Sequence, residues 1–212
     1  MIVLAVDTAS PFPAAALYKA PDRAGTPVLA ETLTVPLGER AAEKLPGLVR
    51  YLLDKAALST RDLSRVAVLT GPGSFTGLRA GAAFCRGLAR ALGVPLFAFP
   101  TFVVASSLVP DPPDADFVLD AGRGEVQRAV RRSGAPVGPP SLTGREEANR
   151  LAGEAGALLA DLGVLGLPLA SAAASLAATA PLEAATDLVL ALGYGRPSAA
   201  EERFGSPGRD GA

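Results

Sequence analysis

The sequence predicts an α/β protein of two lobes, in which the second lobe begins like the first. Residues 2–6 form a short apolar run that ends at Asp7, which is the pattern of a buried strand leading into a turn. Residues 117–119 repeat this pattern and end at Asp120, followed by a glycine-containing turn and another strand. Two lobes with the same opening favour a duplicated fold in which Asp7 and Asp120 hold corresponding positions.

The first lobe is expected to cover residues 1–108, and its first three strands should form an antiparallel meander. Its expected strands are 2–7, 14–18, 28–35, 65–70 and 96–99, and its expected helices are 39–57, 78–92 and 101–108. A proline-rich linker at 110–114 leads to a smaller second lobe, residues 115–195. Its expected strands are 117–120, 126–131 and 157–160, and its expected helices are 143–155, 171–179 and 181–193. Residues 196–212, rich in Gly, Pro and Ser, are expected to be a flexible tail.

Composition excludes several classes of enzyme. The 212 residues are 49% hydrophobic and 19% charged, which is enough apolar material for a sizeable core. The chain contains no histidine and one cysteine, Cys85, so the commonest general base and the commonest metal ligand are both missing. Zinc hydrolases, Ser-His-Asp hydrolases and Cys-His proteases are therefore excluded. Neither a metal nor a cofactor is expected, and a nucleotide could bind only at an interface with a partner.

Charge and hydropathy indicate where the protein works. A net charge of −1 creates no field that would gather nucleic acid unaided, so contact with RNA would need a local patch or a partner's surface. An indirect contact with tRNA is expected. The uncharged stretches 91–110 and 162–182 are interrupted by proline and glycine, so neither predicts a membrane span. The N-terminus shows no basic leader, and one cysteine fits a reducing compartment, so a soluble, cytoplasmic protein is expected.

The turn after the first strand is a candidate phosphate site. Asp7 could organise a metal-bound water there, while Thr8, Ser10 and backbone N–H groups could cradle phosphate oxygens. The alternative is that Asp7 and Ser10 satisfy their own turn. Pro11 and Pro13 favour this alternative because they remove two N–H donors at the same place.

Asp120 has the same two interpretations. It could belong to a second phosphate turn opposite the first, or to an ordinary hairpin in which Gly122 and Gly124 supply positive φ angles. The ordinary hairpin is favoured.

The glycine-rich turn at 71–77 and the helix that follows it suggest a protein interface. Gly73, Gly77, Gly81, Cys85 and Ala89 recur every four residues, and such a ridge of small side chains allows another helix to approach closely. The alternative is that the ridge packs against this chain's own sheet. The predicted helix at 39–57 adds an apolar stripe. The candidate interface residues are Leu45, Leu48, Val49, Leu52, Gly77, Leu78, Gly81, Ala82, Cys85, Leu88 and Ala89.

Several of these segments resemble the TsaB (YeaZ) family. The resemblance rests on residues 2–8, on 43–46, on Asp120 and above all on the run Thr-Gly-Pro-Gly-Ser-Phe-Thr-Gly-Leu-Arg at 70–79, and it covers mainly residues 1–105. It implies the two-lobed actin-like ATPase fold, which is ribonuclease H-like. It also implies a catalytically inactive partner of the transferase TsaD, in the synthesis of threonylcarbamoyladenosine next to the tRNA anticodon. The ATPase TsaE and a second copy of the chain are the other implied partners.

The chain departs from the family pattern at three places, one of which is residues 193–197, where such proteins carry a Tyr-Leu-Arg-like segment. Residues 40–44 stand where such proteins usually carry a His-Ser pair, and the turn after Asp7 contains prolines. The competing hypothesis is a small ATP-dependent kinase or ATPase of the same fold, with Asp7 and Asp120 on opposing turns. That hypothesis predicts hydrolysis of Mg-ATP by the isolated chain.

Overall fold

A computed structural model describes residues 1–19, 28–34, 41–109, 112–166 and 168–186. The predicted tail at 196–212 and most of the predicted helix at 181–193 lie outside these ranges. From 181 to 186 the chain forms one short 3-10 helix, η2 (Leu182–Ala184), so this part of the predicted α-helix is wrong.

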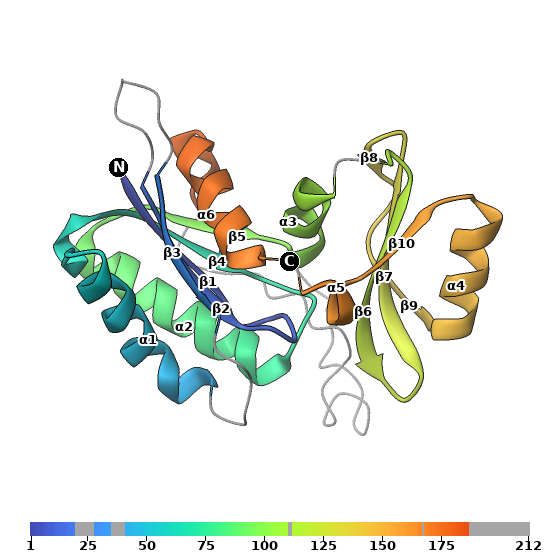
Figure 1. Cartoon of the computed structure of the whole chain (residues 1–212), viewed down its shortest axis with the longest axis horizontal. Helices are drawn as coiled ribbons and strands as arrows, with labels where there is room; N and C mark the ends of the chain where they lie inside the picture. The colour runs from blue at the N-terminus through green and yellow to red at the C-terminus, as the bar shows by residue number, and fades with distance from the viewer. Residues whose placement is uncertain (20–27, 35–40, 110–111, 167, 187–212) are drawn as a thin grey trace, which may run out of the picture.

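The first sheet has five strands in the order β3-β2-β1-β4-β5 (Figure 1). They are β1 (Ile2–Asp7), β2 (Ala14–Lys19), β3 (Val28–Thr34), β4 (Leu63–Leu69) and β5 (Leu96–Phe99). The first three are antiparallel, which confirms the predicted meander, whereas β4 lies parallel to β1 and β5 parallel to β4. The central strands are almost wholly apolar because both faces of this sheet are covered.

Two helical layers cover this sheet (Figure 1). One face carries α1 (Ala41–Lys55), which contains Pro46, and α2 (Phe75–Leu92), which follows the glycine-rich turn. Ser74 caps the start of α2, and Gly93 ends it with a left-handed φ of 67°. The short η1 (Thr60–Asp62) links α1 to β4. The other face carries α3 (Thr101–Leu108) and α6 (Leu169–Thr179). No described helix is both long and apolar enough to span a bilayer.

The second sheet has the order β10-β6-β7-β8, and β9 also pairs with β7. Its strands are β6 (Ala115–Gly122), β7 (Glu125–Arg132), β8 (Ala135–Pro136), β9 (Ser141–Gly144) and β10 (Leu158–Asp161). The helices α4 (Arg145–Glu154) and α5 (Leu162–Leu165) accompany it. As in the first sheet, a strand containing the aspartate pairs antiparallel with the next strand along the chain.

Helix α6 returns to the first sheet, although its residues were predicted to belong to the second lobe. Its alanine-rich face packs on β1, β2 and β4, where small side chains allow a close approach. Arg65 of β4 fixes its end, because the guanidinium Nη1 donates to the carbonyl oxygens of Ala177 (2.6 Å) and Ala180 (2.7 Å). These are carbonyls at the C-terminal end of a helix, where a cation is favourable.

Candidate functional site

The Asp7 turn, residues 7–13 between β1 and β2, is closed on itself by a carboxylate. Asp7 Oδ1 accepts hydrogen bonds from the backbone N–H groups of Ala9 (2.9 Å) and Ser10 (3.0 Å). The other oxygen, Oδ2, accepts the Ser10 hydroxyl at 2.6 Å. Asp7 is 1% exposed, so its carboxylate serves the turn and not the solvent.

The hydroxyl groups of this turn are also bonded within the protein. The Ser10 Oγ accepts the N–H of Phe12 at 3.2 Å, in addition to its bond with Asp7. The Thr8 hydroxyl donates to the carbonyl oxygen of Gly77 at 2.6 Å, which ties the turn to the first turn of α2. Each of these groups has a protein partner where a phosphate oxygen would need a donor.

The turn therefore does not fit a nucleotide phosphate. Phosphate-binding turns present free N–H groups in a concave array, but here Asp7 takes the N–H groups of Ala9 and Ser10. Pro11 and Pro13 have no N–H to donate. The structure follows the alternative interpretation, in which Asp7 and Ser10 satisfy their own turn.

Burial raises the pKa of Asp7 above its ordinary value, and the hydrogen bonds from Ser10 and Ala9 lower it only in part. The native state thus binds this proton more tightly than the unfolded chain does. The stability that Asp7 contributes is fully present below the unfolded pKa of about 3.8 and is lost as the pH rises through the higher folded pKa.

We expect Asp7→Asn to be at least as stable as the wild type at pH 7, because it removes the buried charge and keeps an oxygen for Ala9 and Ser10. Its advantage over the wild type should shrink as the pH is lowered toward 4. Asp7→Ala should lose about 2–4 kcal/mol, since it leaves buried N–H groups unsatisfied. Urea unfolding at both pH values measures this, and Asp7→Asn behaving like Asp7→Ala would contradict it.

The Asp120 turn is an ordinary hairpin between β6 and β7. Asp120 Oδ2 accepts the N–H of Gly122 at 3.1 Å, and Gly122 and Gly124 have φ angles of 76° and 78°. Asp120 Oδ1 lies 3.5 Å from Arg145 Nη2, and the same guanidinium donates to Asp161 Oδ2 at 2.6 Å. Arg145 thus joins the hairpin to β10, and the structure follows the hairpin interpretation.

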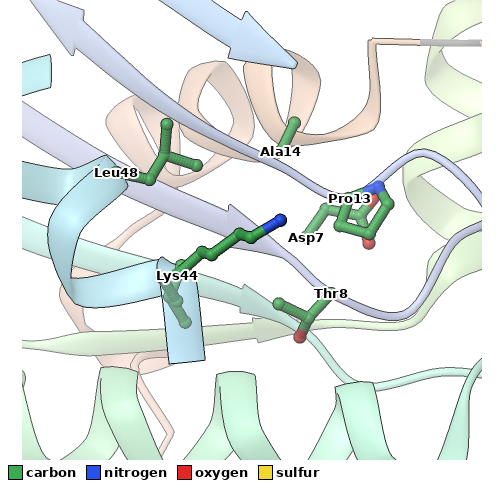
Figure 2. A pocket seen from close by; sticks show the side chains of 7 residues that line it. Asp7, Thr8, Pro13, Ala14, Lys44 and Leu48 are labelled. Atoms are coloured by element: carbon green, nitrogen blue, oxygen red, sulfur yellow. The ribbon is translucent and has the colours of Figure 1, made fainter. Parts of the chain in front are cut away.

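A small pocket lies between the Asp7 turn and the start of α1 (Figure 2). Its lining consists of Asp7, Thr8, Pro13, Ala14, Lys44, Leu45 and Leu48. The Lys44 side chain extends over the pocket from α1, and most of the remaining lining is apolar. Asp7 and Thr8 are already bonded within the protein, so the donor that this lining adds is the Lys44 ammonium.

The glycine-rich turn serves close backbone packing against the Asp7 turn. A Cβ atom at Gly73 would lie 2.1 Å from the carbonyl oxygen of Ala9, and one at Gly77 would lie 1.9 Å from that of Thr8. The N–H of Ser74 donates to the same Ala9 oxygen at 2.9 Å. The glycines are therefore explained by contact between two main chains, without any anion.

Most residues of the predicted interface face inward, which corrects that prediction. Their helices use their most regular apolar stripes against the chain's own sheet, because that sheet must be covered first. The buried members are Leu45, Val49, Leu52, Leu78, Gly81, Ala82, Cys85 and Ala89, and the half-buried members are Leu48, Gly77 and Leu88. The buried members cannot form an outer surface in the folded chain.

Gly81 and Cys85 illustrate the inward direction. A Cβ at Gly81 would lie 2.2 Å from Thr8 Oγ1, so any larger residue there disturbs the Asp7 turn before it can affect a partner. Cys85 is fully buried, with its Sγ 3.8 Å from the carbonyl oxygen of Ala67. Burial raises the pKa of the Cys85 thiol well above its ordinary value, so the group is inert in the native state.

A second row of small residues, absent from the predicted set, lies on the outward side of α2. This outer α2 ridge consists of Thr76, Ala80, Ala83, Gly87 and Ala91. Its members are exposed except for Ala80, which is half-buried, and a Cβ at Gly87 would meet nothing within 4 Å. The spacings of three and four residues could have revealed the ridge in the sequence, although alanine and glycine carry little hydropathy signal.

Larger apolar side chains flank the ridge in the layer formed by α1 and α2. Phe84 and Leu88 of α2 and Leu48 of α1 are half-buried, and Tyr51 of α1 is 44% exposed. Together with the outer α2 ridge they offer a helical face that a second protein could cover closely. Of the predicted interface residues, Leu48 and Leu88 are the two whose side chains lie partly on this outward layer.

Known proteins resemble this chain over part of its length. The family model of TsaD, tRNA N6-adenosine threonylcarbamoyltransferase, matches residues 37–136. An uncharacterised protein of Mycobacterium tuberculosis is 42% identical over 95 residues, which is 45% of this chain and 43% of that protein. The tRNA threonylcarbamoyladenosine biosynthesis protein TsaB of Bacillus subtilis is 33% identical over 98 residues, or 46% of this chain and 40% of that protein. The chain thus spans about two-fifths of these relatives.

Among solved structures, YeaZ from Pseudomonas aeruginosa superposes with a TM-score of 0.56 at 25% identity, over 68% of each chain. The order β3-β2-β1-β4-β5, with β2 antiparallel to its neighbours and helices on both faces, defines the ribonuclease H-like α/β fold of the actin-like ATPases. This confirms the predicted fold class. Within that class, the likeness to a TsaB protein and to YeaZ supports the TsaB (YeaZ) family that the sequence resembles.

Proposed function

We propose that this chain is a non-catalytic partner subunit of a TsaD-type transferase. In this role it supports threonylcarbamoyl transfer to the tRNA adenosine next to the anticodon. The observation that carries the proposal is the closed Asp7 turn, in which the donors that would hold a phosphate are bonded to Asp7 itself. An actin-like fold with this turn occupied by its own side chain is suited to support a partner rather than to turn over ATP.

The docking face in this proposal is the outward layer of α1 and α2. The outer α2 ridge lets a partner helix come close, and Phe84 and Leu88 beside it supply apolar area that an interface would bury. The similarity to a TsaD family model and to a TsaB protein supports a role in the same tRNA modification. TsaE and a second copy of the chain stay as further predicted partners.

The first experiment measures complex mass and ATP turnover. We expect the purified chain to form a complex with TsaD from the same organism, detectable by light scattering after gel filtration. We expect no Mg-ATP hydrolysis by the isolated chain. A lone chain that ignores TsaD and hydrolyses ATP, with activity lost in Asp7→Ala, would favour the kinase or ATPase hypothesis instead.

Gly87→Arg tests where the docking face lies. The site is open, and arginine is a better helix former than glycine by up to about 1 kcal/mol, so the fold should be kept. A long side chain on the outer α2 ridge should weaken TsaD binding roughly ten- to hundredfold, as overpacking costs about 1–3 kcal/mol. Gly153→Arg on α4 is the matched control, because Gly153 is also an exposed helical glycine with open space around it. Equal binding by both variants would place the interface elsewhere.

A further inference from the structure

Arg131 of β7 lies where the chain passes from the first lobe to the second, between α3 and β6. The residue is 5% exposed, and its guanidinium reaches the last turn of α3 in the first lobe. There Nη1 donates to the carbonyl oxygen and to the hydroxyl oxygen of Ser106, each at 3.0 Å. The same guanidinium holds the connecting segment, since Nη2 donates to the carbonyl oxygen of Pro112 (2.7 Å) and Nε to that of Pro113 (3.1 Å). One side chain of the second lobe is thus bonded to the first lobe and to the connection between them.

The acceptors of these bonds suit a buried cation. All four are neutral oxygens, and the Ser106 carbonyl belongs to the C-terminal end of α3, where free carbonyl groups carry partial negative charge. The Phe117 ring of β6 adds a cation–π contact, with its centroid 5.3 Å from Arg131 Cζ. Breaking this arrangement leaves a buried guanidinium or several carbonyl oxygens without partners, which costs free energy in either case.

The connecting segment is also bonded to the second sheet. The carbonyl oxygen of Pro113 accepts the N–H of Gly134 at 3.0 Å, and Asp114 Oδ1 accepts the N–H of Ser133 at 2.6 Å. At the start of β10, the N–H of Leu158 donates to the Asp114 carbonyl oxygen at 3.1 Å. Pro113 and Asp114 therefore move with the second sheet, and Arg131 couples that sheet to α3.

Apolar packing continues across the same junction. Helix α3 packs against α6 and β6 (Figure 1), and one buried core cluster contains Phe102 and Ala105 of α3 together with Phe117 and Leu119 of β6. Two lobes of one chain move relative to each other by default, unless the interface between them is large and hydrophobic. The apolar cluster brings the lobes together. The Arg131 hydrogen bonds add direction, because they require one position of α3 relative to β7.

We propose that Arg131 is an interlobe clamp that holds the two lobes at one fixed angle. Closure of two lobes around a ligand needs a few residues at the hinge to change their backbone angles. At this hinge those residues accept hydrogen bonds from a buried side chain, so closure would first have to break them. The inference goes beyond the proposed function and does not depend on a partner. A partner that binds the chain would meet both lobes already in place, which lowers the entropic cost of binding.

The distance between the lobes tests the clamp directly. Spin labels on Gly47→Cys of α1 and Asn149→Cys of α4 report it by double electron–electron resonance on the full chain. Both positions are exposed, nothing lies within 4 Å of a Cβ at Gly47, and the buried Cys85 is out of reach of the label. Excess unlabelled chain removes distances between copies. We expect one narrow distance distribution that Mg-ATP does not change, and in Arg131→Met a distribution at least about twice as wide.

Arg65→Met is the matched control. Arg65 also donates to carbonyl oxygens at the end of a helix, those of Ala177 and Ala180, and its Cζ lies 5.1 Å from the centroid of the Phe97 ring. Because Arg65 and the sheet on which α6 packs both belong to the first lobe, this variant should lose stability and keep the narrow distribution. If Arg131→Met does not fold, Arg131→Lys replaces it. An ammonium keeps the charge but lacks the planar fork of donors, so this distribution should also broaden.

The inference is overturned if the wild-type distribution is broad, if Mg-ATP shifts it, or if the Arg131 variant stays as narrow as the wild type. Equal broadening in Arg65→Met also overturns it, because any loss of stability would then loosen the lobes. A chain that does not bind TsaD would refute the proposed function and leave these distances unaffected, so the two ideas can fail separately.

Discussion

Gly77→Ala is expected to destabilise the first lobe by about 3 kcal/mol or more, although it replaces glycine by the best helix former. The added methyl would sit 1.9 Å from the Thr8 carbonyl oxygen and 3.2 Å from the Ser74 Cβ. The Thr8 carbonyl cannot move away easily, because the Thr8 hydroxyl is bonded to the Gly77 oxygen at 2.6 Å. Either α2 or the Asp7 turn must shift, and both carry core contacts.

Gly87→Ala is the matched control on the same helix. Nothing lies within 4 Å of its Cβ position, so this variant should gain up to about 1 kcal/mol from helix propensity alone. Urea unfolding of the two variants and the wild type gives the comparison. If Gly77→Ala proved as stable as Gly87→Ala, the contact between the glycine-rich turn and the Asp7 turn would not hold in solution.

This contrast shows which part of the helix could be predicted from its sequence. The repeat of small residues that begins at Gly73 was visible, and so was the end of α2 at Gly93. The sequence did not show what the repeat packs against, because the sheet of the same chain and a helix of a partner both favour small side chains at that spacing. In the structure the repeat packs inside the chain, because Thr8 occupies the space beside Gly77 and Gly81.

Long-range polar contacts were also beyond prediction. Nothing near Arg65 in the sequence indicates that its guanidinium reaches the carbonyl of Ala177, 112 positions later. The return of α6 to the first sheet depends on this contact and on alanines whose weak hydropathy signal fits either lobe. In contrast, the closing of the Asp7 turn was one of two explicit alternatives, because an Asp with a Ser three residues later can satisfy a turn locally.

Asp116→Asn is expected to have the largest effect in the second lobe, a loss of about 3–5 kcal/mol. Asp116 is fully buried on β6, and its two oxygens accept from Arg128 Nε and from Arg132 Nη1, each at 2.6 Å. Both arginines belong to β7, so one carboxylate bridges two guanidinium groups across the β6–β7 pair and compensates part of their charge. An amide leaves their charges uncompensated in a largely dry setting. Urea unfolding, combined with hydrogen exchange of the β6 and β7 amides, measures the loss.

An exposed ion pair of similar geometry serves as a control that shows how much of the expected loss at Asp116 comes from burial. Glu147 accepts from Arg150 through both oxygens, at 2.6 and 2.8 Å, but both side chains are about half exposed. Glu147→Gln should therefore cost little stability, and 1 M NaCl should reduce that cost further. A similar small, salt-sensitive cost for Asp116→Asn would mean that water reaches Asp116 in solution.

Removing all three charged side chains of the cluster distinguishes a neutralising role of Asp116 from a role in directed hydrogen bonding. The triple variant Asp116→Leu, Arg128→Met, Arg132→Met replaces the buried charges by apolar groups of similar length. It should recover most of the stability that Asp116→Asn loses, because no charge is then left without its counter-charge. If the triple variant were as unstable as the single one, the packing of β6 and β7 would depend on the directed hydrogen bonds themselves, and Asp116 would act as a geometric anchor rather than as a neutralising charge.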